Sequence, residues 1–297
     1  MNNIGSEIGF PFQGAVYYTE EATYNGGHDG TVFRFSDAVN VCRLESGDVN
    51  KTLRHVGSAE VADFSTTLID PRLHLEFVWQ PTTLNKLNDW IARTSGDISS
   101  FCVEFNGSKD RSSASSTFVC NGCKCDTMNI KASTGDNYIV TMDCSVSSVV
   151  TSPTATETDP GAVGTTFAAF NRAGGITWGT GSYYVTKSID VTINNNLNDY
   201  WDVGSTSKKA SIPGALDVSG SVDISLDEGG AVHWNTITAG TDIPSIKCDA
   251  GCDASTYDVF TISNGRWTSG AVENNVSGEG LFDSTPFVFK TIAFSTS

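Results

Sequence analysis

The stretch "SIDVTINNNLNDYWDVGS", Ser188 to Ser205, begins as a strand and stops on three asparagines. Ile189, Val191 and Ile193 alternate with polar residues, which is the period of a half-buried strand. The run Asn194–Asn196 breaks the alternation, and an aromatic, glycine-bearing segment follows. The stretch therefore predicts a strand, a polar bend and a segment that presents aromatic side chains.

Length and composition indicate a folded, mainly β chain. The chain has 297 residues, long enough for two domains, because a single core usually stops growing at about 250–300 residues. A hydrophobic content of 39% and a charged content of 18% exclude a disordered chain. The 29 glycines and the many short alternating runs favour an all-β protein.

The net charge of −16 limits the partners that the chain can bind. Sequence-specific recognition of nucleic acid needs basic patches that neutralise phosphates, and the acidic balance argues against it. The same balance is compatible with a surface past which nucleic acid slides without binding.

The first residues, "MNNIGSEIGFPFQG", contain neither the basic nor the apolar region of a signal peptide. No run approaches the roughly 20 apolar residues of a membrane-spanning helix. We expect a protein without membrane insertion that is made and used in solution, initially in a cytoplasm. Its eight cysteines are then thiols or metal ligands, and disulfides are disfavoured.

The two halves of the chain resemble each other across a Ser/Thr/Pro-rich segment. Residues 149–164, "VVTSPTATETDPGAVG", read as a linker between domains at 1–148 and 165–297. His55 to Trp79 lies 147 positions before Asp202 to Leu226, and both stretches read as a Gly-Ser bend, a polar loop and an alternating strand. We interpret the halves as a tandem duplication.

Each half is expected to contain about half a dozen strands with one short helix against them. The clearest helix is predicted over Thr82 to Gly96, because Leu84, Leu87 and Ile91 recur at spacings of three and four and a glycine follows. At the equivalent place in the second half, residues 229–242 give a much weaker helical pattern.

A cluster of cysteines is the sharpest chemical feature. Cys120, Cys123 and Cys125 lie within six residues, and Cys144 follows on the next predicted strand. A C-x-x-C turn suits tetrahedral zinc, with Cys144 as a fourth ligand if the two strands pair. The alternative is that all four are small buried core residues, as free cysteines commonly are. No second C-x-x-C pair supports the metal site.

No catalytic constellation is apparent. The motifs of hydrolases, phosphate-binding loops, zinc proteases and calcium loops are absent from the sequence. The loop "GGHDG" around His28 lacks a nearby nucleophile and reads as a surface turn. Tyr200 and Trp201 could form a sugar-binding platform, but aromatic residues at strand ends are more typical of subunit contacts.

The motifs and their order resemble the two-copy tail tube proteins of long-tailed bacteriophages and archaeal tailed viruses. The stretch "VTKSIDVTINNNLNDYWDVGS…IPGALDVSGSVDISLDEGG" matches a strand, a Gly-Ser bend and a second strand of that family, and "VSGEGLFDSTPFVFKTIAFSTS" resembles its last hairpin. In the first half, "GCKCDTMNIKASTGDNYIVTMDCSV" is similar to another family segment. The family usually has apolar residues at the positions of Cys125 and Cys144, which favours core positions for both.

The resemblance implies two tandem β-sandwich or barrel domains, each with a short flanking helix, and a structural role without catalysis or cofactor. Three chains would form a pseudo-hexameric ring, and rings would stack into a hollow tail through which DNA is ejected. One sheet of each domain would join its neighbours into a continuous barrel around that channel. Expected partners are further copies of the chain, the tail terminator, the baseplate or tip and the tape measure, in a virion tail assembled in the host cytoplasm. DNA would pass without specific binding.

Two other functions stay open at the level of sequence. A carbohydrate-binding β-sandwich, as an adhesin or a decoration of the virion, would use the aromatic residues and remain discrete in solution. A metal-dependent hydrolase would use the cysteine cluster, carry bound metal and lose its fold or activity on Cys123→Ser substitution. A tube protein requires neither glycan nor metal.

Overall fold

The computed structural model describes most of the chain and is mainly β, as the sequence predicts. The described residues are 16–28, 30–47, 50–54, 61–66, 69–81, 86–91, 96–106, 117–152, 160–164, 166–170, 176–179, 186–205, 207–225, 235, 237–251, 257–269 and 282–296.

Eighteen strands lie within these residues. In the first half they are β1 (Val16–Glu20), β2 (Val32–Arg34), β3 (Val39–Glu45), β4 (Asn50–Arg54), β5 (Val61–Thr66), β6 (Arg72–Val78), β7 (Phe101–Asn106), β8 (Thr117–Ser133), β9 (Ile139–Ser145) and β10 (Ser148–Ser152). In the second half they are β11 (Ile176–Trp178), β12 (Thr186–Asn194), β13 (Leu197–Trp201), β14 (Lys208–Pro213), β15 (Asp217–Ser225), β16 (Ile243–Gly251), β17 (Tyr257–Trp267) and β18 (Phe282–Thr296).

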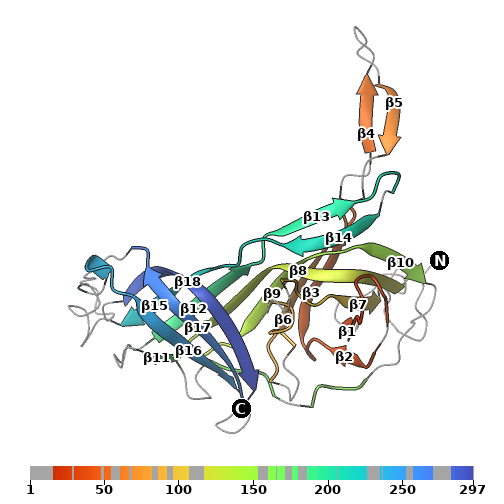
Figure 1. Ribbon diagram of the computed structural model, residues 1–297. Helices are drawn as coiled ribbons and strands as arrows, with labels where there is room; N and C mark the ends of the chain where they lie inside the picture. The colour runs from red at the N-terminus through yellow and green to blue at the C-terminus, as the bar shows by residue number, and fades with distance from the viewer. Residues whose placement is uncertain are drawn as a thin grey trace, which may run out of the picture.

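Fourteen of these strands form one large sheet that curls, as large open sheets do (Figure 1). Its main path is β11-β16-β17-β18-β15-β12-β8-β7-β1-β2, and β9, β6, β3 and β10 join it through β8. The remaining four strands form two hairpins, β4–β5 and β13–β14. Both hairpins extend to the same side of the body, and β4–β5 projects well beyond it (Figure 1).

The two halves share one order of strand pairing. In the first half β1, β7, β8, β9, β6 and β3 are successive neighbours, and in the second half β11, β16, β17, β18, β15 and β12 are. Each half inserts a hairpin between the last two strands of this order, β4–β5 between β3 and β6 and β13–β14 between β12 and β15. The hairpin strands of the second half begin and end 147 positions after those of the first.

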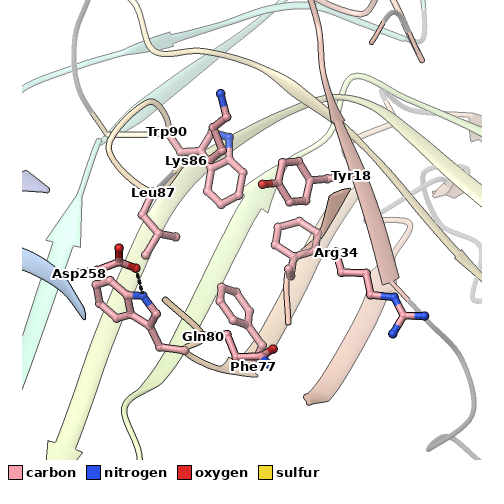
Figure 2. A pocket seen from close by; sticks show the side chains of 10 residues that line it. Tyr18, Arg34, Phe77, Gln80, Lys86, Leu87, Trp90 and Asp258 are labelled. Carbon is pink, nitrogen blue, oxygen red and sulfur yellow. Dashed lines mark hydrogen bonds between the residues drawn. The ribbon is translucent and has the colours of Figure 1, made fainter. Parts of the chain in front are cut away.

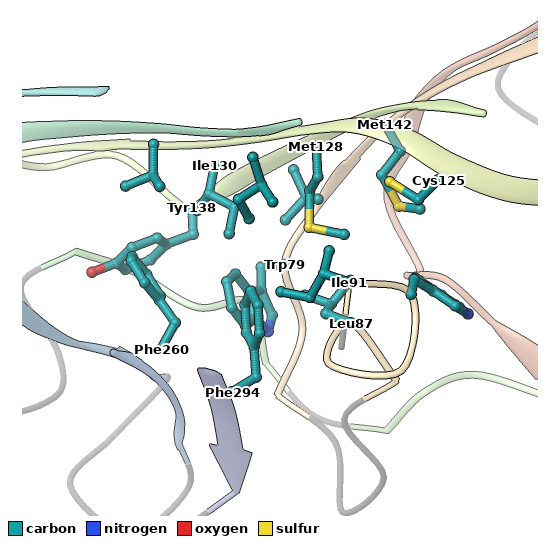
Figure 3. Close-up of a cluster of buried hydrophobic side chains, with 14 of the residues drawn as sticks. Trp79, Leu87, Ile91, Cys125, Met128, Ile130, Tyr138, Met142, Phe260 and Phe294 are labelled. Atoms are coloured by element: carbon teal, nitrogen blue, oxygen red, sulfur yellow. The ribbon is translucent and has the colours of Figure 1, made fainter. Parts of the chain in front are cut away.

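One hydrophobic cluster runs through both halves. Trp79, on the segment that follows β6, stacks on Phe260 of β17 at 6.0 Å and lies 5.8 Å from Phe294 of β18, measured between ring centroids. Its indole Nε1 donates a hydrogen bond to the Asp258 carboxylate at 2.8 Å. Figure 3 shows these rings beside Tyr138 and Ile130, so the halves pack through a shared core.

The predicted linker lies partly within the described residues. Its first residues belong to β10, which pairs antiparallel with β8. Farther along, the Val163 backbone N–H donates to both carboxylate oxygens of Asp37, at 3.0 and 3.1 Å. The division into domains at 1–148 and 165–297 stays a prediction.

The structure does not show the predicted flanking helices. Residues 86–91 form turns, in which the N–H of Asp89 donates to Lys86 O and that of Ile91 to Asn88 O. Trp90 packs 4.6 Å from Phe101, and Leu87 and Ile91 are buried. Their spacing identified the face toward the core, but turns satisfy that spacing as well as a helix does. In the second half residues 235, 237 and 238 are helical, and the Ala239 N–H donates to the Asn235 carbonyl at 2.9 Å. Residues 82–85, 92–95, 229–234 and 236 of the predicted spans lie outside the described residues.

Candidate functional site

The two halves of the sheet are joined where β12 pairs with β8. The first part of β8 pairs with β7, and its last seven residues pair with β12, from Thr127↔Asn194 to Ser133↔Ser188. Ile189, Val191 and Ile193 are at most 2% exposed, which confirms the inward face predicted for this strand. On the other face the Asn129 amide donates to Asp190 Oδ1 and Thr192 Oγ1, at 2.6 and 2.9 Å. β12 therefore has a neighbouring strand along both of its edges.

β3 is the counterpart of β12 in the first half, but among the described strands its one partner is β6. Both pairs carry a register irregularity at the same place, between Val39 and Val41 in β3 and between Thr186 and Ser188 in β12. Among the described strands of the large sheet, β2, β3, β10 and β11 have a single partner, and β3 is the longest of them at seven residues. An open edge of this length is a template for pairing with another chain.

The inward residues of β3 are only partly covered. Cys42 and Leu44 occupy the register positions of Ile189 and Val191, yet they are half-buried where the latter are fully buried. Val41, at the open edge, is 37% exposed. Among the described residues, nothing covers β3 as β8 covers β12.

The β13–β14 hairpin lies over the outer face of the first half, at the start of β6, the middle of β8 and the end of β9. Lys208 on β14 has a fully buried ammonium that lies 2.7 Å from the Asp70 carboxylate and 2.9 Å from that of Asp199. Arg72 of β6 also reaches Asp199, at 2.9 Å. Lys124 of β8 donates to the Ser211 carbonyl at 2.9 Å. Buried charges of both signs therefore hold this hairpin on its own chain. We call the residues that receive the hairpin, which are Asp70, Arg72, Lys124 and Ser145, the ionic seat.

Asp199 is the hairpin residue at the centre of the contact with the ionic seat. Burial alone would raise the pKa of its carboxyl, but hydrogen bonds from Ser211, Lys208 and Ser145 and the charge of Lys208 outweigh it and lower the pKa below its ordinary value. The Ser145 hydroxyl donates to Asp199 at 3.0 Å and is fully buried under the hairpin. The carboxylate therefore stays ionised at neutral pH and binds both cations.

The polar bend before β13 is also held by buried hydrogen bonds to the first half. Asn196 adopts a positive φ of 51°, as asparagine tolerates, and turns the chain from β12 into β13. Asn195 is fully buried, and its amide donates to the carbonyls of Cys125 and Trp90 at 2.9 and 3.3 Å. The run of asparagines predicted the bend, but nothing in the sequence predicted its hydrogen-bond partners in the first half.

Tyr200 and Trp201, the predicted contact residues, lie side by side on β13 and differ in exposure. Tyr200 is 51% exposed. The Trp201 indole is partly buried: its Nε1 donates to the Ile69 carbonyl at 3.3 Å, and the Lys208 ammonium lies 5.7 Å from its ring centroid. Trp201 therefore helps to hold the hairpin on its own chain. Contacts of Tyr200 and Trp201 between subunits stay a prediction.

Comparison with known families agrees with this architecture. A family model described as phage tail tube protein matches residues 9–280. The chain belongs to the phage tail tube protein family. No curated protein matches it significantly. Membership makes this tail tube protein a structural component of a virion tail, as the resemblance of its motifs implied.

The cysteine cluster of this tail tube protein lies in its core. Cys125 and Cys144 are opposite one another on β8 and β9, as the sequence suggested, and Cys120, Cys123 and Cys144 are each at most 1% exposed. Burial raises the pKa of the Cys120 thiol to about 12 and that of Cys123 well above its ordinary value, which opposes the deprotonation that zinc requires. Within the described part of the chain no three His, Cys, Asp or Glu side chains are placed to hold a metal ion. The zinc site stays a prediction that this geometry does not favour.

One trio of side chains resembles a thiol catalytic site, and sequence reasoning missed it. His28 Nε2 lies 3.5 Å from the Cys102 sulfur and 3.7 Å from the carboxylate of Glu104, which is 2% exposed. Burial and the charge of Glu21 raise the pKa of the Cys102 thiol well above its ordinary value. A buried thiol among carboxylates is not activated as a nucleophile, so the trio reads as internal packing.

Two hollows are too small or too well paired to suggest a substrate. The first, of about 40 Å³, is lined by Tyr18, Trp90, Trp79 and Asp258 among others (Figure 2); it has room for a few waters at most. The second, of about 430 Å³, lies over the β8–β12 junction. There Lys131 pairs with Asp190 at 3.1 Å and Ser133 with Asp136, which leaves few free donors.

No helix in the described residues is long and apolar enough to cross a membrane.

Proposed function

We propose that this chain is the major tail tube subunit, and that three copies close into a ring whose six halves are arranged around a channel. Rings of this kind would stack into the hollow tail through which viral DNA is ejected. The chain carries out no reaction in this role, and its binding energy resides in repeated contacts between copies.

The open edge of β3 carries the proposal. Within one chain, β12 receives β8 of the other half along its outer edge. Along its inner edge β3 pairs with β6, the counterpart of β15, and this pair has the same register irregularity. No described strand lies on its outer edge. A second copy that supplies its own second half to β3 would repeat the β8–β12 junction between chains. If the same junction repeats within and between chains and the rotation closes, the result is a ring with twice as many halves as chains.

The charge of the chain suits this role. A net charge of −16 opposes the binding of phosphates, and a channel must let DNA pass without retaining it. The other expected partners, which are the terminator, the baseplate or tip and the tape measure, would meet the ends and the inside of the same tube.

Negative-stain electron microscopy of the purified protein at high concentration, with and without tail particles as seeds, tests the proposal. Hollow tubes with a regular axial repeat are expected, and their cross-section distinguishes three chains from six. Monomers that never join a seed would contradict it. In that case binding to a glycan array would test the alternative of a decoration or adhesin.

A further inference from the structure

The chain contains two hairpins with the same pairing pattern. The described contacts hold β13–β14 on the chain's own sheet, whereas β4–β5 projects beyond the body (Figure 1). In β13–β14, Asp199 is opposite Ser211 and Trp201 is opposite Lys208, with a register shift before Trp201. In β4–β5, Thr52 is opposite Phe64 and Arg54 is opposite Val61, with the shift at the same place. Thr52, Val61 and Phe64 thus hold the register positions of Asp199, Lys208 and Ser211.

The outer face of the second half has a row of residues that corresponds to the ionic seat. Under the β13–β14 hairpin, Arg72, Ser145 and Lys124 are neighbours across β6, β9 and β8. In the second half, the same row across β15, β18 and β17 consists of Ser219, Val288 and Arg266. Val288 therefore stands where Ser145 stands in the first half.

The corresponding residues differ in what covers them. Ser145 is fully buried beneath its hairpin, whereas Val288 is 45% exposed and the Arg266 side chain is 65% exposed. A single exposed valine is ordinary on a protein surface, but Val288 stands at the register position that a hairpin buries in the first half. We call the row formed by Ser219, Val288 and Arg266, with Val288 at its centre, the apolar seat.

Between the two halves, the residues of the seat and those of the hairpin differ in the same direction, from polar to apolar. The Ser145 hydroxyl of the ionic seat contacts Lys208 and Ser211 of its hairpin. The apolar seat offers Val288 in place of Ser145, and the β4–β5 hairpin carries Val61 and Phe64 at the positions of Lys208 and Ser211. At these three positions a charged or polar residue is exchanged for an apolar one, and this matched exchange identifies the pair that belongs together.

We propose that the β4–β5 hairpin of one copy docks on the apolar seat of a second copy, with Val61 and Phe64 at the positions that meet Val288. This inference rests on the proposed function, because it needs a second chain beside the first. It adds the specificity of the contact: an apolar hairpin does not compensate the buried charges of the ionic seat, and a charged hairpin loses its partners on the apolar seat. Each hairpin is thereby restricted to the opposite half, so that chains join in one register only.

Disulfide formation between single-cysteine substitutions tests the contact directly. Phe64→Cys and Val288→Cys chains are mixed, assembled and oxidised, and the cross-linked peptides are identified by mass spectrometry. A link between positions 64 and 288 of different chains is expected. Ser65→Cys with Val288→Cys is the matched control, because neighbouring strand residues point to opposite faces. Equal linking from positions 64 and 65 would overturn the inference.

A second measurement separates this inference from the proposed function. Val288→Asp is expected to raise the concentration needed for assembly about tenfold or more, and Val61→Lys in the same chain to recover much of the loss by recreating the cation of Lys208. Val150→Asp, at an exposed valine of β10, is the control. If the unmodified chain assembles and Val288→Asp assembles equally well without a 64–288 link, the apolar seat is wrong and the tube stands. If the unmodified chain never assembles, the proposed function itself fails.

Discussion

β12 and β3 hold the same place in the strand pairing of the two halves and differ in how much described structure covers them. β12 has a neighbour along both edges and inward residues that are fully buried. β3 has one neighbour and inward residues that are half-buried. The hairpins that follow them repeat the contrast, since β13–β14 is held by buried ion pairs of its own chain.

The contrast has a physical consequence for assembly. A strand and a hairpin that are satisfied within the chain add to the stability of the monomer, whereas an open edge and an uncovered seat add to association. Substitutions near β12 and its hairpin should therefore change the free energy of unfolding, and substitutions at β3 should change the concentration needed for assembly.

The largest effect on the monomer is expected from Lys208→Met. The substitution removes a fully buried ammonium and leaves Asp70 and Asp199 with less compensation. We expect the free energy of unfolding to fall by about 3 kcal/mol, at the lower end for broken buried pairs because Arg72 still reaches Asp199. Denaturant unfolding followed by circular dichroism measures it.

The neighbouring residue provides a matched control for this change. Lys209 pairs with Asp202 at 2.7 Å, but both side chains are more than half exposed. Lys209→Met should cost less than about 1 kcal/mol, as exposed ion pairs do. Equal losses from both substitutions would show that the ionic seat does not hold the hairpin.

Val41→Lys should have the opposite profile, with little effect on the monomer and a large one on assembly. Val41 lies at the open edge of β3 and is 37% exposed, so the free energy of unfolding should change by no more than about 0.5 kcal/mol. A lysine at a strand edge blocks pairing with another strand. The concentration at half-assembly, measured by sedimentation, should rise about tenfold.

Val150→Lys on β10 controls for added surface charge, since Val150 is 52% exposed on another strand with a single partner. If both lysines hinder assembly equally, β3 is not the edge that joins copies.

The sequence predicted what depends on neighbouring residues along the chain. The alternation at Ile189, Val191 and Ile193 gave the inward face of β12, and the asparagines gave the bend at Asn196. The helix predicted over residues 82–96 is not shown: its described residues 86–91 form turns, from which Trp90 packs into the core, because apolar spacing reports only which side chains face the core.

What depends on distant residues could not be predicted. Lys208 and Asp199 are surface-like in the sequence, and only the fold brings Arg72 and Asp70 to them across more than 100 positions. The open edge of β3 is likewise invisible in a pattern, because its residues alternate like those of a paired strand. Cys125 and Cys144 are an intermediate case: their pairing followed from adjacent strands, but their burial followed from the core around them.

The smallest effect, and the most direct report on the edge itself, is the alkylation of Cys42. This thiol is half-buried on β3 at the position of the fully buried Ile189, whereas Cys102, Cys120, Cys123 and Cys248 have no exposed surface. Burial raises the pKa of Cys42, so labelling at neutral pH will be slow, but it should exceed that of these four cysteines in the unassembled chain. Assembly should reduce it several-fold, because a strand paired along β3 would cover Cys42 as β8 covers Ile189. Labelling of individual peptides, quantified by mass spectrometry before and after assembly, measures this change. Unchanged labelling of Cys42 in intact tubes would mean that β3 remains open there and that copies join through another surface.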